Sequence, residues 1–463
     1  MQTQSNFRLL VVRLGAMGDI LHALPAVTAL RQAHPEWVID WVVEPRWSAL
    51  LAAEEGQKTE EGPPSGARQD AERLRDLGDF DEKRTSAAKA AADFTGFTRG
   101  INPPSPSVLS FSAGGKAQVD SVDFMRGLKP PPPSGLGRFA INQASPFQSY
   151  RNPTFQNDRN AGQPLVDHLH FAATKDWRKA PLSGKTVHEI KALRAALRAA
   201  KYDAVLDLQG AIRSAVVARL AGCRRVIGEA KPRELPARWL FTERVATRGV
   251  HVIEQDVELA SAVAGDELTP VPPWLPVDRA AEAWATNVLP PNTGARGGDQ
   301  PAVLINPGAG WGAKRWPVQR YDAVAQGFID RGFRILVNAG PGEEKLAEVI
   351  ARGTDGAAIP LSCTVAQLIA ITRRVALVVA GDTGPLHLAC ALGRPVVGIY
   401  GPTDPSRNGP FGTQFRVLRS PQSRRDHSRR ESPEAGLLTI QPDDVLRAAD
   451  ALLYPETASE KDK

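Results

Sequence analysis

The sequence predicts an α/β protein with two nucleotide-binding, Rossmann-like folds that face one cleft, and two strand–turn–helix segments carry this prediction. Near the start of the chain, the apolar run 9–12 leads through a glycine-containing turn with Asp19 into an apolar-periodic stretch that begins at Ile20. Near its end, the run 376–380 leads through the turn 382–384 into a second helix start. Open α/β sheets bind ligands at the carboxyl ends of their strands. Each turn is therefore a candidate binding site.

Apolar runs and amphipathic stretches alternate through the first half of the chain. A short apolar run predicts a buried strand, and apolar residues at positions i, i+3 and i+4 predict a helix. The first helix ends before Pro35, because the residue that precedes a proline disfavours the α conformation. The patterns predict strands at 9–12, 37–43 and 204–208 and helices at 19–33, from about Trp47, at 187–201 and at 212–220.

The second half repeats this alternation after the Pro-rich passages 270–276 and 289–298, which indicate a linker. Apolar strands that alternate with amphipathic helices are typical of a parallel sheet covered on both faces. The predicted strands are 302–305, 333–338, 376–380 and 396–400, and the predicted helices are 318–331, 343–352, 365–373, one after Gly384, and 442–453.

Residues 56–163 differ in composition from the rest of the chain. They contain Pro63-Pro64, Pro103-Pro104 and the run 130–133, with many Ser, Asn and Gly residues. Low hydrophobicity and repeated proline leave too little apolar surface to offset the entropy lost on ordering. We expect a disordered insertion with a short helix at 70–77; the functional alternative is a lid that grips an acceptor.

Composition and charge exclude several classes of protein. The 463 residues are 42% hydrophobic and 23% charged, which is ordinary for a globular protein with two domains. A net charge of +6 favours acidic partners but does not by itself indicate nucleic acid. The three cysteines have no metal-site or disulfide spacing, which fits a reducing cytoplasm. Without a signal peptide or an apolar run long enough to span a bilayer, any membrane contact is expected to be peripheral.

The turn 382–384 is predicted to bind phosphate groups. Its backbone N–H groups lie at a helix N-terminus, where unpaired donors and the helix dipole favour an anion. Lys314 follows another strand and reaches the same edge, although its surroundings do not match a P-loop. Lys314 is either a phosphate-binding cation or a solvated loop charge, and His387 is either a ligand or a packed polar residue.

The first half supplies a candidate base and candidate cations. Asp19 could accept a proton from a substrate hydroxyl, or it could simply cap the helix that follows. Arg178, Lys179 and Arg233 could bind acidic groups of an acceptor, since guanidinium groups match phosphates and carboxylates. The alternative for these three is an ordinary solvated surface.

Seven segments together resemble glycosyltransferase family 9, and within it the lipopolysaccharide heptosyltransferase I group. They are Arg13-Leu-Gly-Ala-Met-Gly-Asp-Ile-Leu-His22, Asp40-Trp-Val-Val-Glu44, Trp177-Arg-Lys179, Tyr202-Asp-Ala-Val-Leu-Asp-Leu-Gln-Gly210, Lys314-Arg-Trp-Pro317, Asp382-Thr-Gly-Pro-Leu-His387 and Tyr400-Gly-Pro-Thr-Asp-Pro405. They cover both ends and most of the chain outside the insertion.

The resemblance implies a GT-B architecture. The implied acceptor-binding domain is 1–289, with the insertion at 56–163; the implied nucleotide-sugar-binding domain is 301–440, and a C-terminal helix within 441–455 crosses back to the first domain. The implied reaction is inverting transfer of L-glycero-D-manno-heptose from ADP-heptose to Kdo of lipid A, with no cofactor and no essential metal. The implied location is peripheral, on the cytoplasmic face of the inner membrane.

The resemblance also implies roles for individual residues. Asp19 would activate the acceptor hydroxyl, Lys314 would bind the donor phosphate, and Glu343 would contact the ribose. The donor turn would comprise Asp382, Thr383, Gly384 and His387, and the acceptor-binding cations would be Arg178, Lys179 and Arg233.

Three alternative functions remain open from the sequence. One is another family 9 transferase, such as heptosyltransferase II, and another is a non-hydrolysing nucleotide-sugar epimerase with a similar two-domain cleft. The third is a nucleotide-sugar binding module without turnover. The insertion and the glycine-rich loop 308–312 depart from the family pattern, which leaves the acceptor open.

Overall fold

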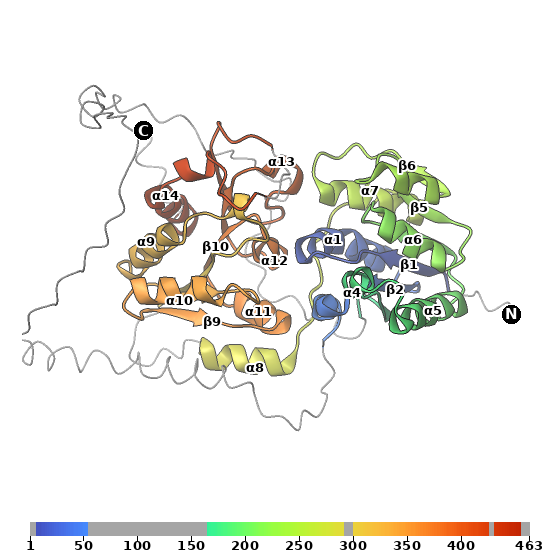
Figure 1. Ribbon diagram of the computed structural model, residues 1–463, viewed down its shortest axis with the longest axis horizontal. Coiled ribbons are helices and arrows are strands. Elements are labelled where there is room, and N and C mark those ends of the chain that lie inside the picture. The colour runs from blue at the N-terminus through green and yellow to red at the C-terminus, as the bar shows by residue number, and fades with distance from the viewer. Residues whose placement is uncertain (1–5, 54–163, 291–299, 426–429, 455–463) are drawn as a thin grey trace, which may run out of the picture. The chain divides into compact units, whose positions relative to one another are not determined.

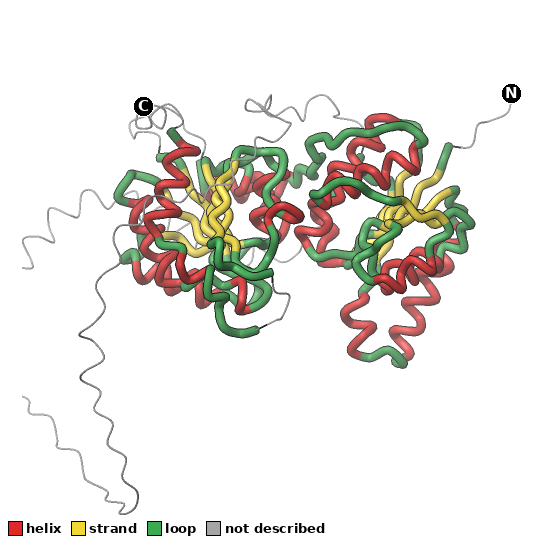
Figure 2. The backbone as a smooth tube through the Cα atoms, turned by 90° about the horizontal axis from the view of Figure 1, so that it is seen from above, coloured by secondary structure: helices red, strands yellow, loops and turns green. Residues whose placement is uncertain are grey.

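A computed structural model describes residues 6–53, 164–290, 300–425 and 430–454 (Figure 1). The expected disordered insertion 56–163, with its short helix, lies outside the described residues. The two predicted α/β folds are confirmed: each is built on a parallel six-stranded sheet, and Figure 2 shows helices on both sides of the strands in each.

The first sheet has the strand order β3-β2-β1-β4-β5-β6. Its strands are β1 (Arg8–Val12), β2 (Val38–Val43), β3 (His168–Phe171), β4 (Ala204–Asp207), β5 (Val226–Glu229) and β6 (Glu243–Val245). Its helices are α1 (Met17–Ala33), α4 (Thr174–Lys179), α5 (Gly184–Ala199), α6 (Ile212–Leu220) and α7 (Val252–Ala264), with 3₁₀ turns η1 (Pro45–Leu50) and η3 (Leu235–Leu240).

The alternation of side chains along β1 explains why this strand is apolar throughout. Leu9 and Val11 lie in the core that also contains residues of α1 and α7. Leu10 and Val12 lie in a separate core with residues of α5 and α6. Because both faces of the sheet are covered, every position of the strand is buried or nearly so, as expected for a parallel sheet.

The second sheet has the order β12-β11-β10-β7-β8-β9, which repeats the arrangement of the first. Its strands are β7 (Ala302–Asn306), β8 (Arg334–Asn338), β9 (Ala358–Leu361), β10 (Leu377–Gly381), β11 (Val396–Tyr400) and β12 (Phe415–Arg419). Its helices are α9 (Val318–Ile329), α10 (Glu344–Gly353), α11 (Val365–Thr372), α12 (Gly384–Ala391), α13 (Pro405–Asn408) and α14 (Pro442–Leu453), with 3₁₀ turns η4 (Gly312–Lys314) and η5 (Leu437–Thr439).

In both sheets the strand order reverses beside the first strand. In the first sheet β1 lies between β2 and β4, and in the second β7 lies between β8 and β10. The turns that follow β1 and β4, and those that follow β7 and β10, therefore flank a topological switch point, which is where open α/β sheets bind ligands. Asp19 lies beside the first switch point, and Lys314 and Asp382 lie beside the second.

Two helices pack against different elements from those that the sequence and its resemblance to the family imply. The C-terminal helix, expected to cross back to the first domain, packs as α14 against α9, β11 and β12 of the second sheet. α8 (Arg279–Val288) falls within the predicted first domain, but it packs against α11 of the second. Glu282 of α8 forms ion pairs with Arg373 and Arg374 at the end of α11 (2.6 and 2.5 Å).

Candidate functional site

Asp19 lies in the first turn of α1 and remains partly accessible. Its Oδ2 accepts a hydrogen bond from the backbone N–H of Ala16 (3.1 Å), so the carboxylate does cap the helix. Its oxygens also lie 3.7 Å from Arg13 Nη2 and 3.8 Å from Arg233 Nη1. With 27% of the side chain exposed, the carboxylate can still meet a ligand.

The turns of the first sheet are fixed to one another by hydrogen bonds. Gln209 Oε1, after β4, accepts from the N–H of Leu14, after β1 (2.8 Å). The carbonyl of Gly210 accepts from the N–H of Glu234, after β5 (2.9 Å). Gly210 has a positive φ of 62°, and a Cβ there would lie 3.0 Å from the backbone nitrogen of Arg233. Glycine thus allows the loop with Arg233 to approach Asp19.

Arg13 is a buried cation near Asp19 that the sequence analysis does not name as a site residue. The residue is 5% exposed, and its charge influences two buried carboxyl groups, those of Asp207 and Asp256. Burial raises the pKa of Asp207 to about 6 and that of Asp256 to about 7, and the charge of Arg13 opposes both shifts. Arg13 begins the motif that ends with Asp19 and His22, which is the signal that could have identified it.

The second sheet brings Lys314 to Asp382. Lys314 Nζ lies 2.5 Å from Asp382 Oδ2 and 5.4 Å from the ring centre of Trp311. Burial opposes ionisation of Asp382, but the hydrogen bond from His387 and the charge of Lys314 lower its pKa below the ordinary value. Thr383 is the N-cap of α12, and no side chain caps this helix, so no side-chain oxygen occupies the N–H groups at its start.

His22 of α1 and His387 of α12 join the two candidate sites. His22 Nε2 lies 3.1 Å from His387 Nδ1, and His387 Nε2 lies 3.2 Å from Asp382 Oδ1. An ionised carboxylate only accepts, so His387 Nε2 carries a proton; in a neutral His387 the other nitrogen accepts from His22. His387 is thus a packed polar residue that connects Asp382 to the helix bearing Asp19.

Both histidines on the first-domain side of this contact favour the neutral form. Burial is the main cause that lowers the pKa of His22 well below 6.5, and neighbouring His387 and His251 add to it. Burial likewise lowers the pKa of His251 to about 4. His251 caps α7 through Nδ1 and donates from Nε2 to the carbonyl of Gly409 in the second domain (3.1 Å).

Two glycines allow α1 and α12 to meet. A Cβ on Gly18 would lie 2.9 Å from His387 Cδ2, and a Cβ on Gly384 would lie 2.7 Å from Met17 Sδ. Contacts this short require neighbouring atoms to move. Each helix therefore presents a glycine where the other places a larger side chain.

Glu343 lies under the loop that follows β7. Its Oε1 accepts from the N–H of Ala309 (3.1 Å), and a Cβ on Gly308 would collide with its carboxyl group. Burial raises its pKa above the ordinary value. Glu343 therefore lies at the carboxyl end of the second sheet, and its proposed contact with a ribose stays a prediction.

Arg178 and Lys179 lie on α4, which follows β3 at the carboxyl end of the first sheet. Lys179 pairs with the exposed Asp176 (3.1 Å). Arg178 belongs to a larger group of cations around Lys175, whose pKa is lowered by burial first and then by Arg46, Arg213 and Arg178. Lys175, Arg46 and Arg213 are absent from the sequence-based list, because they are scattered along the chain and are brought together only by folding.

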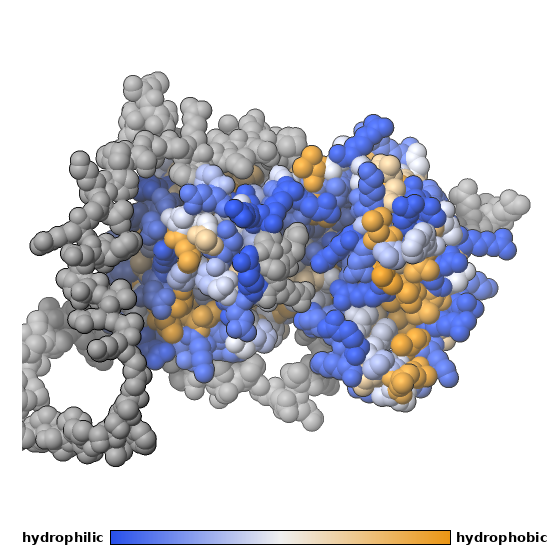
Figure 3. All heavy atoms as spheres, turned by 45° about the horizontal axis from the view of Figure 1, so that its top comes forward, coloured by the Kyte–Doolittle hydropathy of each residue, from blue (hydrophilic) through white to orange (hydrophobic). Residues whose placement is uncertain are grey.

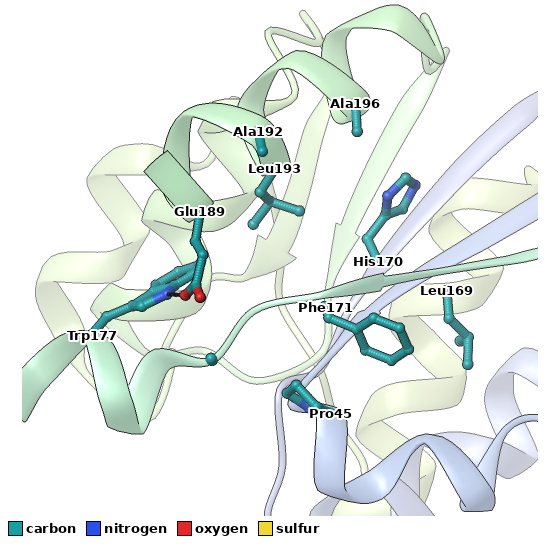
Figure 4. Close-up of a pocket in the computed structure, with 10 residues that line it drawn as sticks. Pro45, Leu169, His170, Phe171, Trp177, Glu189, Ala192, Leu193 and Ala196 are labelled. Carbon is teal, nitrogen blue, oxygen red and sulfur yellow. Dashed lines mark hydrogen bonds between the residues drawn. The ribbon is translucent and has the colours of Figure 1, made fainter. Parts of the chain in front are cut away.

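A hollow of about 440 Å³ lies between β3, α4 and α5 (Figure 4). Trp177 Nε1 donates to Glu189 Oε2 on one side (2.7 Å), and Phe171 and Leu193 are among its apolar lining. None of Asp19, Lys314 or Asp382 lines it. The predicted cleft between the two domains is thus not this hollow and stays a prediction.

Among the residues that the structure describes, no group of three or more His, Cys, Asp or Glu side chains is arranged to bind a metal ion. No helix in this part of the chain combines the length and hydropathy needed to cross a bilayer.

Comparisons with known proteins agree with this arrangement. A family model described as glycosyltransferase family 9 (heptosyltransferase) matches residues 190–437. Lipopolysaccharide heptosyltransferase 1 of Escherichia coli K12 is 33% identical over 263 residues, which cover 56% of this chain and 79% of that protein. Lipopolysaccharide heptosyltransferase 2 of the same strain is 31% identical over 170 residues, 35% of this chain and 49% of that protein.

Solved structures show the same fold. The E. coli heptosyltransferase WaaC with ADP superposes with a TM-score of 0.60 at 22% identity, covering 96% of this chain and 100% of that one. A family 9 glycosyltransferase from Veillonella parvula gives 0.60 at 15% identity, covering 97% and 98%. The architecture is thus GT-B, and because the family model spans more than half of the 463 residues, the chain belongs to glycosyltransferase family 9.

Proposed function

We propose that this glycosyltransferase is an inverting heptosyltransferase that transfers L-glycero-D-manno-heptose from ADP-heptose to Kdo of the lipid A inner core. One observation carries the proposal. Asp19, flanked by Arg13 and Arg233, shares α1 with His22, and His22 bonds to His387 of the Asp382 turn. The helix that bears the candidate base is thus bonded to the turn that forms the candidate diphosphate site. The likeness to lipopolysaccharide heptosyltransferase 1 supports the choice of sugar and acceptor.

The proposed reaction is a single displacement. Asp19 takes the proton of an acceptor hydroxyl, whose oxygen forms a bond to the anomeric carbon of heptose from the face opposite the nucleotide. The bond between that carbon and the ADP oxygen breaks, ADP leaves with the bonding electrons, and the configuration inverts. General-base catalysis of this kind contributes roughly 10²–10⁴ in rate.

The donor side stabilises the leaving diphosphate. Backbone N–H groups at the start of α12, with Thr383 and Gly384, supply fixed dipoles, and Lys314 supplies positive charge. These groups support transfer that uses no cofactor and no essential metal. Glu343 is proposed to contact the ribose of the nucleotide.

The acceptor side is the basic carboxyl edge of the first sheet. Arg233, Arg178 and Lys179 are proposed to bind the carboxylate and phosphate groups of a Kdo–lipid A acceptor, with Lys175, Arg46 and Arg213 nearby. Such an acceptor lies in a membrane, so we place the enzyme peripherally on the cytoplasmic face of the inner membrane. No part of the proposal involves nucleic acid.

A second candidate function is transfer to the acceptor of heptosyltransferase II. The 31% identity to lipopolysaccharide heptosyltransferase 2 supports it. A transfer assay distinguishes the two. The enzyme is given ADP-heptose with Kdo–lipid A or with the same acceptor already carrying one heptose, and products are followed by mass. A heptose increment on the first acceptor alone is expected; an increment on the second alone assigns the other reaction. Membership of a glycosyltransferase family does not favour the epimerase alternative.

The base is tested by Asp19→Asn. We expect kcat to fall about 10³-fold while the affinity for ADP, measured by calorimetry, changes less than threefold, because the amide cannot accept the proton. Asp266→Asn, at an exposed carboxylate that follows α7, is the matched control and should transfer heptose as the wild type does. If Asp19→Asn transfers heptose at the wild-type rate, another group must accept the proton of the acceptor hydroxyl.

A further inference from the structure

Large hydrophobic side chains are exposed mainly on one side of the first domain. Of the eleven that are exposed among the described residues, seven belong to β3, the α4–α5 connection, α5, α6 and η3. They are Phe171, Leu182, Val187, Ile212, Val216, Leu235 and Trp239. Figure 3 shows hydrophobic residues lying among hydrophilic ones on the face of this domain that it presents.

Four of these side chains lie on α6 and η3, two elements that pack against each other. Ile212 and Val216 are four residues apart and share one face of α6. Leu235 and Trp239 lie on η3, which packs against α6. The N–H of Ile212 donates to Glu234 Oε2 (2.8 Å), which fixes the start of α6 beside the start of η3. We call these four residues, with Leu182 before α5, the apolar edge.

The apolar edge is surrounded by positive charge. Basic residues outnumber acidic ones in each contributing segment, 174–189, 212–216 and 231–239. Lys185 and Lys231 are exposed there. Lysine and exposed single apolar side chains are typical of a surface that enters a lipid interface, whereas the cores of protein–protein interfaces are depleted in lysine.

The apolar edge is continuous with the candidate acceptor site. Arg233 lies between Leu235 of the edge and Asp19, to which its guanidinium group is 3.8 Å distant. α6 follows β4, η3 follows β5, and α5 follows β3 by way of α4, so their starts lie at the carboxyl edge that bears Asp19. An amphiphilic acceptor could therefore reach Asp19 while its lipid part stays in a bilayer.

We propose that the apolar edge docks on an anionic phospholipid surface. Trp239, Leu235, Leu182, Ile212 and Val216 enter the interfacial region, while the surrounding lysines and arginines bind lipid phosphates. This inference rests on the proposed function only in that the acceptor is a membrane lipid; the docking itself is measured without any acceptor.

The test is co-sedimentation of the full chain with vesicles. One set contains phosphatidylethanolamine and phosphatidylglycerol, and the other contains phosphatidylcholine alone. We expect binding to the anionic vesicles, at least tenfold weaker binding to the neutral ones, and loss of binding as salt is raised. The pair Leu235→Ser and Trp239→Ser, made together, should weaken anionic-vesicle binding at least tenfold. The pair Lys185→Glu and Lys231→Glu should do the same.

Matched controls lie in the second domain. Leu438→Ser removes an exposed hydrophobic side chain there, and Lys345→Glu reverses an exposed charge on α10. Both should bind vesicles as the wild type does. All variants should keep the thermal unfolding midpoint of the wild type and, where the wild type transfers heptose, should keep its rate on a deacylated soluble acceptor.

Three results would overturn the docking proposal. They are a wild type that binds no vesicles, apolar-edge variants that bind as tightly as the wild type, or variants that turn a dimer into a monomer by size exclusion with vesicle binding unchanged. A wild type that binds vesicles but transfers no heptose to any acceptor would instead contradict the proposed function, so the two failures are separate.

Discussion

Asp19 caps its helix in a way that still leaves room for the proposed base role, although the sequence presents the two roles as alternatives. As the third residue of α1 it accepts the N–H of Ala16, and its partly exposed oxygens also face Arg13 and Arg233. A carboxylate has about four lone-pair directions, so one capping bond leaves room for a substrate hydroxyl. Capping also fixes the position of the side chain, which a general base requires.

His22 is expected to act on the donor site without touching the donor. Replacing it with Ala removes the partner of His387 Nδ1, so His387 is no longer oriented toward Asp382. We expect kcat/KM for the nucleotide sugar to fall about tenfold, while acceptor KM changes little. Steady-state kinetics with each substrate varied in turn measures this. His188→Ala, at an exposed position on α5, is the control; equal losses in both variants would exclude a specific role for His22.

At the scale of helices, the contact between α1 and α12 depends on small residues. Gly18 and Gly384 allow the helix N-termini to approach until His387 and Met17 touch the facing backbone. Each residue begins or nearly begins its helix, so the intrinsic cost of glycine in a helix interior is small here. The same approach brings the buried imidazoles within hydrogen-bond distance.

Gly18→Ala is expected to separate the two helices. The added Cβ would lie 2.9 Å from the buried ring of His387, and overpacking of this kind costs about 1–3 kcal/mol of the free energy of unfolding. Heptosyl transfer should fall at least tenfold, because the bond between His22 and His387 lengthens. Gly184→Ala, at the start of α5, is the control, since its Cβ would meet no atom within 4 Å. Denaturant unfolding and transfer rates are measured for both variants. An unchanged free energy of unfolding and an unchanged transfer rate for Gly18→Ala would contradict the expected separation of the helices.

At the scale of the whole molecule, buried charge near the switch point of the first sheet makes stability depend on pH. Asp256 of α7 is buried, its Oδ2 has no hydrogen-bond partner, and burial raises its pKa from 3.8 to about 7. A group whose folded-state pKa is raised stabilises fully below its unfolded pKa. That stabilisation is lost as the pH rises from about 4 to about 7. The buried histidines act in the opposite direction, because their lowered pKa values remove stability as the pH falls below 6.5.

Asp256→Asn is expected to remove the loss of stability at higher pH. An amide stays neutral, so the variant should gain on the wild type between pH 4 and pH 8, by up to the order of 4 kcal/mol from the shift in pKa. Thermal unfolding across this range measures the difference. The exposed Asp266→Asn should show no such trend. A constant difference between Asp256→Asn and wild type at every pH would contradict the raised pKa.

Several elements of the first sheet escaped prediction for an identifiable reason. β3 is a four-residue edge strand with two histidines, and β6 has three residues that include Glu243 and Arg244. Edge strands are covered on fewer sides, so they lack the apolar run that identifies β1 or β10. α8 lies between two Pro-rich passages that indicate a linker, so the sequence analysis does not predict it. Asp278 nevertheless caps this helix, and Glu282 pairs with Arg373 at the end of α11.

The sequence by itself determined the two α/β folds, most central strands and the turns that carry Asp19 and Asp382, because burial on both faces and helical periodicity are local patterns. The tertiary structure alone decided that His22 meets His387, 365 positions along the chain. It also decided that Arg13 lies among buried carboxyl groups, that Arg233 reaches Asp19, and that α14 stays on the second sheet. These outcomes depend on how closely whole helices and loops can approach, which is set by glycines, buried volumes and paired charges that no local pattern encodes.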